Sequence, residues 1–194
     1  KLAMHPASWP IVCELTRERP RLMNGTLLVN RADPGSHLHC AREEDIAWPR
    51  THYTVKDGRI FCDNLVVFPY LTDVYPGDGG LIVLPGSHKA SFVRPRGMFY
   101  ADEKITDEIP AGIVNITPKA GDIVIISEAL THGTLTWKAK RDRRALVLRY
   151  RPQHLGGDTS IPEEVQQRLL PETRELIAQQ GFDSLKEIVK NTAA

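Results

Sequence analysis

The amino-acid sequence predicts a mainly β protein built as a sandwich or a barrel, and three observations lead to this prediction. Fourteen glycines and fourteen prolines divide the 194 residues into short apolar runs rather than helical stripes. Most of these runs are rich in branched or aromatic residues, which suit the pleated surface of a strand. Turn signals separate the runs at regular spacing, a pattern typical of antiparallel sandwiches and barrels.

About eight strands are expected between residues 26 and 150. Six apolar runs are interpreted as strands, at 26–30, 65–68, 81–84, 112–116, 122–126 and 145–150. The turn Lys56-Asp57-Gly58 lies between two further short runs, 53–55 and 59–61, and predicts a hairpin. Because Pro69 has no backbone N–H to donate, the strand that it follows must bulge or lie at a sheet edge.

The composition changes after residue 152, and short helices are expected to follow. Segments 160–163 and 184–187 both have the form Ser-x-x-Glu, which is typical of a helix start. In the last helix Leu185, Ile188 and Val189 fall on one face, as expected of a helix that packs outside a β core. We expect a single domain over residues 1–194, with a core at about 26–152 and a helical segment over 153–194.

Charge and composition exclude several classes of partner. Lys and Arg number 25 against 24 Asp and Glu, so the net charge of +1 gives no broad field that attracts nucleic acid or anionic lipid. No apolar run approaches the ~20 residues that cross a bilayer. Cys13, Cys40 and Cys62 are an odd number at scattered spacing, which suits reduced thiols and a cytoplasmic location. The first residue is Lys rather than Met, which leaves room for an amino-terminal segment upstream.

One histidine and one arginine suggest a site. None of the seven histidines belongs to a compact zinc pattern, but His132 follows an apolar strand at a glycine-containing segment, where an imidazole can point into a cleft. Arg143 begins the next strand, and an antiparallel return would bring its guanidinium beside the histidine. Arg144 is an alternative, because only one of two neighbouring strand residues faces inward.

Three stretches together resemble the phytanoyl-CoA dioxygenase-like members of the non-haem iron, 2-oxoglutarate-dependent oxygenases. They are Leu-Thr-Asp-Val-Tyr-Pro-Gly-Asp-Gly-Gly-Leu-Ile-Val-Leu-Pro-Gly-Ser-His-Lys at 71–89, the segment 121–134 that ends in His-Gly-Thr, and Arg143. The resemblance implies a double-stranded β-helix (jelly roll, cupin-like) that uses Fe(II), 2-oxoglutarate and O2. It also implies that His132 is the distal iron ligand and that Arg143 and Thr134 bind the far carboxylate of 2-oxoglutarate.

The proximal iron ligand is less directly indicated. His39, in Leu-His-Cys-Ala, resembles a stretch of a large subgroup of the family and is preferred, and His52 is the alternative. The family normally has Asp two residues after this histidine, whereas Ala41 follows His39. In the halogenases that the chain resembles, chloride takes the place of the missing carboxylate. Glu128, near the end of the strand before the distal histidine, could instead supply an oxygen ligand, contact substrate or be solvated.

The sequence thus predicts an Fe(II)- and 2-oxoglutarate-dependent oxygenase that hydroxylates a small-molecule metabolite. Halogenation at a site without aspartate is one alternative, and a jelly-roll protein that binds a metabolite without catalysis is another. Neither nucleic acid nor a membrane is an expected partner, and the apolar face of the last helix could join two copies in a homodimer. The identity of the substrate does not follow from the sequence.

Overall fold

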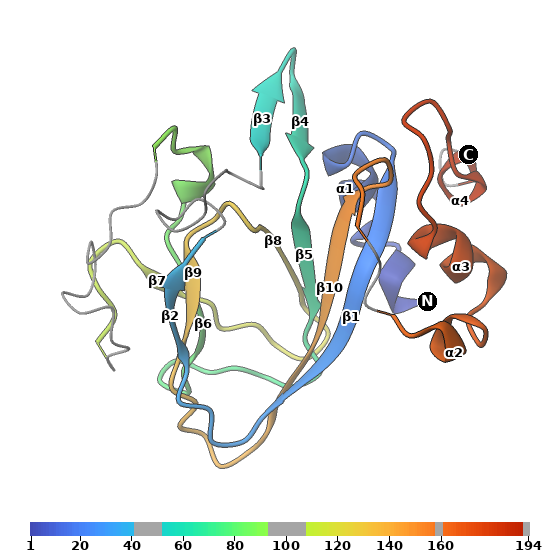
Figure 1. Ribbon diagram of the computed structural model, residues 1–194. Helices are drawn as coiled ribbons and strands as arrows, with labels where there is room; N and C mark the ends of the chain where they lie inside the picture. Colours follow the sequence, from blue (N-terminus) through green and yellow to red (C-terminus); the bar gives the residue numbers. More distant parts are fainter. Residues whose placement is uncertain (41–51, 93–107, 158–160, 192–194) are drawn as a thin grey trace.

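The computed structural model describes residues 1–40, 52–92, 108–157 and 161–191, which form two antiparallel sheets that face each other (Figure 1). The first sheet has the strand order β1-β10-β5-β8, the second has the order β2-β9-β6-β7, and β3 and β4 form a separate hairpin. The strands are β1 (Pro20–Asn30), β2 (Ser36–His39), β3 (Tyr53–Lys56), β4 (Arg59–Cys62), β5 (Leu65–Pro69), β6 (Gly80–Val83), β7 (Val114–Asn115), β8 (Ile123–Ser127), β9 (His132–Leu135) and β10 (Arg143–Pro152). The predicted fold class, a mainly β jelly roll with flanking carboxyl-terminal helices, is confirmed.

Short helices flank the first sheet on the side away from the second (Figure 1). They are η1 (Leu2–Met4), α1 (Trp9–Leu15), α2 (Glu163–Gln166), α3 (Pro171–Ile177) and α4 (Glu187–Lys190), whereas η2 (Ser87–Lys89) follows β6. None of the helices in the described ranges has the length and apolar character needed to cross a bilayer.

Period-two alternation divides the core into an inner and an outer layer. In β5, Val66 and Phe68 pack with Leu81 of the second sheet, in a cluster that lies between the two sheets. Their neighbours Leu65 and Val67 pack on the opposite side, with residues of α1 and the carboxyl-terminal helices. The space between the sheets is therefore where inward-facing side chains of both sheets meet.

The predicted hairpin is confirmed, because β3 and β4 pair along their whole length. The six apolar runs coincide with β1, β5, β6, β7, β8 and β10, although β7 has only 2 residues. β2 and β9 were not predicted, because their residues Ser-His-Leu-His and His-Gly-Thr-Leu are too polar to be recognised as strands. These two short strands contain both of the preferred iron ligands.

The expectation for Pro69 is wrong. β5 is an interior strand of the first sheet, and its pairing with β10 keeps one register. The ladder instead stops at the pair Val67 and Leu148, and it returns as an isolated bridge between Tyr70 and Ala145. The missing N–H of Pro69 falls in this interruption, so the proline is tolerated without a bulge.

The expected start of the last helix is also wrong. α4 begins at Glu187 rather than near Ser184, and its own N-cap residue makes no side-chain cap hydrogen bond. The carboxylate of Glu175 in α3 accepts hydrogen bonds from the backbone N–H groups of Glu187 and Ile188, at 2.7 and 3.2 Å. A neighbouring helix therefore supplies the cap that the sequence suggested would be local. Ser160, in the other proposed cap, lies outside the described residues.

A buried lysine ties the last helix to the first strand. Lys186 is fully buried, and its Nζ donates hydrogen bonds of 2.9 to 3.0 Å to three backbone carbonyl oxygens, those of Pro20, Leu176 and Ala178. Burial lowers the pKa of Lys186 to about 8, and the positive charge of Arg21 acts in the same direction. The apolar face predicted for this helix packs against the outer core, as expected for residues Leu185, Ile188 and Val189.

Candidate active site

Two histidines from adjacent strands meet on the inner face of the second sheet. His39 in β2 and His132 in β9 are register partners, and their ring centroids lie 4.4 Å apart. Val83, the partner of His132 on its other side, packs in the cluster between the sheets. Leu38 belongs to a separate cluster, so alternation turns His39 toward the first sheet. The structure thus brings together the two residues preferred as iron ligands.

Backbone hydrogen bonds orient both rings. Nδ1 of His132 lies 2.7 Å from the carbonyl oxygen of Leu130, and Nδ1 of His39 lies 2.9 Å from that of His37. Because a carbonyl oxygen only accepts, each Nδ1 holds the proton and each Nε2 keeps a lone pair. Burial lowers the pKa of His132, and the charge of His39 acts in the same direction, which favours the neutral imidazole that binds metals. The pair fits a divalent metal ion.

Arg143 lies buried at the start of β10 and contacts neutral groups. Its Nη2 donates to the hydroxyl of Tyr70 at 3.1 Å, and its Nη1 donates to Oδ1 of Asn30 at 3.3 Å. Its buried Nε has no hydrogen-bond partner in the described part of the chain. A buried cation that is not neutralised is costly, so this guanidinium is suited to bind a carboxylate that comes from outside the chain.

The guanidinium of Arg143 faces the space in which the histidines lie. A Cβ added at Gly80 in the second sheet would lie 3.4 Å from its Nε, so the side chain reaches across the sandwich and glycine leaves room for it. Gly80 pairs with Leu135, and His132 lies three residues along the same strand, or about 10 Å. A small dicarboxylate can bridge such a separation. Thr134, two residues from His132, faces the same side.

The expected antiparallel return from His132 to Arg143 is wrong. β9 belongs to the second sheet, whereas β10 belongs to the first and pairs with β1 and β5. Arg143 therefore approaches the histidines across the sandwich and not from a neighbouring strand. Arg144 points outward and donates to Asp142 at 2.8 Å, so Arg143 is the inward-facing residue of the two.

A sequence comparison decides the family. Residues 7–145 match the phytanoyl-CoA dioxygenase (PhyH) family. The chain belongs to this family. The resemblance inferred from the three stretches is thereby confirmed. A search of curated proteins found no match to the chain.

Solved structures with the same fold include HygX from Streptomyces hygroscopicus. The HygX structure with nickel and 2-oxoglutarate bound is 25% identical, with a TM-score of 0.65 over 78% of this chain and 63% of that chain. The iron-bound HygX structure is 26% identical, with a TM-score of 0.67 over 78% of this chain and 65% of that chain. The PhyH-family chain thus spans a little under two thirds of HygX. The epimerase SnoN from nogalamycin biosynthesis shares the fold, with 18% identity and a TM-score of 0.56 over 89% of this chain and 62% of that chain.

His52, the alternative proximal ligand of the PhyH-family chain, binds to the carboxylate of Asp63. Nδ1 of His52 lies 2.7 Å from Oδ2 of Asp63, and the backbone N–H of His52 donates to Oδ1 of the same carboxylate at 2.6 Å. The His52 side chain is 61% exposed. These contacts tie His52 to the loop after β4 and favour His39 as the proximal ligand. Ala41 lies outside the described residues.

Glu128 points at His132 and is not simply solvated. Its side chain is 15% exposed, and its Oε1 accepts a hydrogen bond from Nε of Arg149 at 3.0 Å. Its Oε2 lies 3.9 Å from Nε2 of His132. Within the described ranges, however, no group of three or more His, Cys, Asp and Glu side chains is close enough to hold a metal ion.

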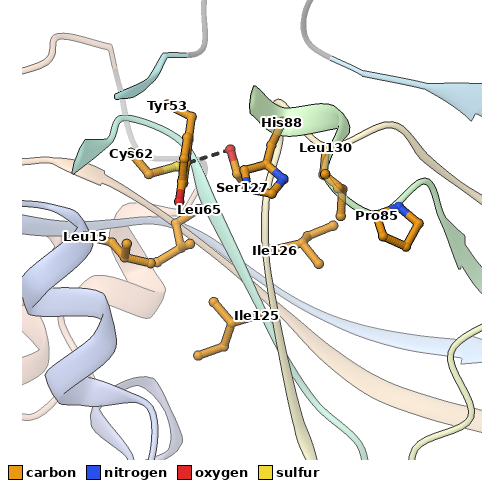
Figure 2. A pocket seen from close by; sticks show the side chains of 11 residues that line it. Leu15, Tyr53, Cys62, Leu65, Pro85, His88, Ile125, Ile126, Ser127 and Leu130 are labelled. Carbon is orange, nitrogen blue, oxygen red and sulfur yellow. Dashed lines mark hydrogen bonds between the residues drawn. The ribbon is translucent and has the colours of Figure 1, made fainter. Parts of the chain in front are cut away.

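An apolar pocket of about 370 Å³ lies beside the turn that contains Glu128 (Figure 2). Its lining residues are Leu15, Tyr53, Cys62, Leu65, Pro85, Gly86, His88, Ile125, Ile126, Ser127 and Leu130. The rings of Tyr53 and His88 make an edge contact, with centroids 4.5 Å apart. Neither His132 nor Arg143 lines this pocket, so it is a neighbour of the site and not the site itself.

Sequence reasoning missed Arg149 and Asn30. Arg149 lies six residues after Arg143 on one strand, so period-two alternation could have placed both on the inner face. Asn30 gave no signal of its own, because its position opposite Arg143 depends on the pairing of β1 with β10.

Proposed function

We propose that this chain is an Fe(II)- and 2-oxoglutarate-dependent oxygenase, within a single domain, that hydroxylates a small-molecule metabolite. The supporting observation is that His39 and His132 keep their Nε2 lone pairs in the same inter-sheet space as the buried guanidinium of Arg143. Membership of the PhyH family and the HygX structures with iron or 2-oxoglutarate support the same assignment.

Each side chain has a defined task in this proposal. His39 and His132 hold Fe(II) through Nε2, and Arg143 and Thr134 hold the far carboxylate of 2-oxoglutarate. Tyr70 fixes the orientation of the guanidinium through its hydroxyl. Bound iron supplies the activation of O2, with 2-oxoglutarate as the source of two electrons and with succinate and CO2 as its products. The apolar cluster between the sheets excludes water from this space.

A small-molecule substrate is supported by HygX, one structure of which contains hygromycin B. Hydroxylation is favoured over chlorination because the carboxylate of Glu128 lies near Nε2 of His132, where a negative charge disfavours a halide. The chlorination hypothesis depends on the surroundings of Ala41, which lies outside the described residues. Product mass spectrometry with and without chloride separates the two reactions.

The proposal is tested by anaerobic titration of the full chain with Fe(II) and 2-oxoglutarate. The chelate of the two gives a visible charge-transfer band, which we expect in the wild type and not in His132→Ala. Succinate formation in air, dependent on both additions, is the second expected result. A His132→Ala variant with an unchanged band would overturn the assignment of the iron site, and a wild type without a band would overturn the oxygenase assignment.

A further inference from the structure

Among the described residues the proposed iron site has two imidazole ligands, and the aspartate that the family usually has two residues after the first histidine is replaced in the sequence. Ala41 stands where a ligand two residues after His39 would be expected, and an imidazole pair alone leaves the metal with neutral protein ligands. The carboxylate of Glu128 ends 3.9 Å from Nε2 of His132, the ring atom that the Leu130 hydrogen bond leaves free for a metal. An oxygen ligand is thus available from the turn that follows β8.

One short turn positions both Glu128 and His132. The backbone N–H of Glu128 donates to the carbonyl oxygen of Asn64 at 3.0 Å, and the backbone N–H of Thr131 donates to Oγ of Ser87 at 2.7 Å. The carbonyl of Leu130, in the middle of the same turn, accepts from Nδ1 of the histidine. These hydrogen bonds therefore hold the backbone of the turn, and with it the positions from which the two side chains start.

Alternation brings the same side chain inward. Val124 and Ile126 of β8 pack in the cluster between the sheets, and Glu128 continues this period-two series just beyond the strand end. Ser127, one residue earlier, points toward Cys62 of the outer cluster, with its Oγ 3.2 Å from the Cys62 Sγ (Figure 2). The carboxylate is consequently in the space that the two imidazoles face, and its low exposure of 15% removes most of its contact with water.

Arg149 orients the carboxylate of Glu128 through one oxygen and leaves the other oxygen available. Nε of Arg149 contacts Oε1 at 3.0 Å, and Oε2 remains on the side of the histidine. Metal-bound carboxylates are commonly held in this way by a hydrogen bond to their second oxygen. Without Glu128 the guanidinium would be an uncompensated positive charge beside a divalent cation.

The distance between Oε2 of Glu128 and Nε2 of His132 is only slightly longer than two ligands of one metal ion require. Two ligands at right angles on an ion with bonds of about 2.1 Å lie about 3 Å apart, so the 3.9 Å separation must shorten by about 1 Å. Rotation about the side-chain torsions of Glu128 covers this distance while the turn stays in place. This gap agrees with the finding that the described residues form no closed set of three ligands.

We infer that Glu128 supplies the oxygen ligand of the metal site, with Arg149 holding its second oxygen. The inference rests on the proposed function and goes beyond it, because it assigns the anionic ligand to the turn between β8 and the distal histidine. It predicts a metal site that needs no halide to complete its protein ligands.

The test is anaerobic calorimetric titration of the metal-free full chain with Co(II), together with the visible spectrum of the bound Co(II). We expect Glu128→Gln, which keeps the shape and an acceptor for Arg149, to weaken Co(II) binding at least tenfold and to change the spectrum. Glu14→Gln, at an exposed glutamate of α1, is the matched control and should bind like the wild type. Circular dichroism shows whether each variant is folded.

A second variant separates ligation from a structural role. Glu128→Ala leaves a space in which added formate can act as an oxygen ligand, so formate should strengthen Co(II) binding to this variant and not to the wild type. If His132→Ala loses Co(II) while Glu128→Gln binds within threefold of the wild type, or if formate has no effect on Glu128→Ala, Glu128 is not a ligand and the proposed function stands. If His132→Ala binds Co(II) like the wild type, the proposed function itself fails.

Discussion

Replacing Arg143 with methionine should strongly weaken 2-oxoglutarate binding without destabilising the free protein. The guanidinium is buried, contacts two neutral oxygens at 3.1 and 3.3 Å, and leaves Nε without a partner. Removing its charge relieves a desolvation cost, which offsets the two lost hydrogen bonds. A lost charge-assisted carboxylate contact is worth about 3 kcal/mol, so the affinity for 2-oxoglutarate should fall about one hundredfold.

A thermal shift measurement with Fe(II) excluded and Mn(II) present checks this prediction. At a 2-oxoglutarate concentration of about one hundred times Kd, binding stabilises the wild type by about 2.7 kcal/mol, which corresponds to a rise in Tm of about 5–10 °C for a chain of this size. Arg143→Met, whose Kd would be about one hundredfold higher, should be only half saturated at the same concentration and should rise in Tm by about 1 °C. Arg144→Met, at an exposed arginine bonded to Asp142, is the control and should respond like the wild type. An equal rise in Tm for Arg143→Met and the wild type would refute the reasoning.

Three further predictions concern the strands and the carboxyl-terminal helices. A Cβ at Gly133 would lie 2.8 Å from the carbonyl oxygen of His37. Gly133→Ala should therefore push β2 away from β9 and weaken Co(II) binding about tenfold, whereas Gly156→Ala, at an open position, should leave Co(II) binding unchanged. Equal calorimetric affinities of the two variants for Co(II) would contradict this prediction. Lys186→Met should lower the free energy of unfolding in urea by about 3 kcal/mol, because three buried carbonyls lose their donor; an unchanged value would show that they have other partners. The pKa of Lys186 is lowered to about 8 from 10.5, so between these pH values the unfolded chain binds more protons than the folded chain. The free energy of unfolding should therefore rise with pH across that window in the wild type and not in Lys186→Met. Identical pH profiles of stability for the two proteins would exclude the pKa shift.

The sequence was sufficient where local patterns decide the structure. Apolar runs and the Lys56-Asp57-Gly58 turn predicted most strands and the hairpin, because period and turn chemistry act over a few residues. His132 and Arg143 could be singled out because the resemblance placed both in recognisable segments. The chain's membership of the PhyH family confirmed that resemblance.

The remaining features depend on contacts between distant segments. β2 and β9 are polar and short. They form strands because they pair with each other and because β9 also pairs with β6. The assignment of β9 and β10 to opposite sheets follows from the strand order and not from the sequence between them. The cap of α4 comes from Glu175, twelve residues before Glu187, and so no local motif could reveal it. Glu128 had three open roles until its contact with Arg149 excluded simple solvation.

The central claim is that His39 and His132 hold one metal ion beside the 2-oxoglutarate pocket of Arg143. An anaerobic crystal structure of the full chain with Mn(II) and 2-oxoglutarate tests this claim most directly. The account predicts a single ion bonded to Nε2 of both histidines, with the far carboxylate of 2-oxoglutarate on the Arg143 guanidinium. An ion bound at His52 instead, or 2-oxoglutarate bound away from Arg143, would contradict the account.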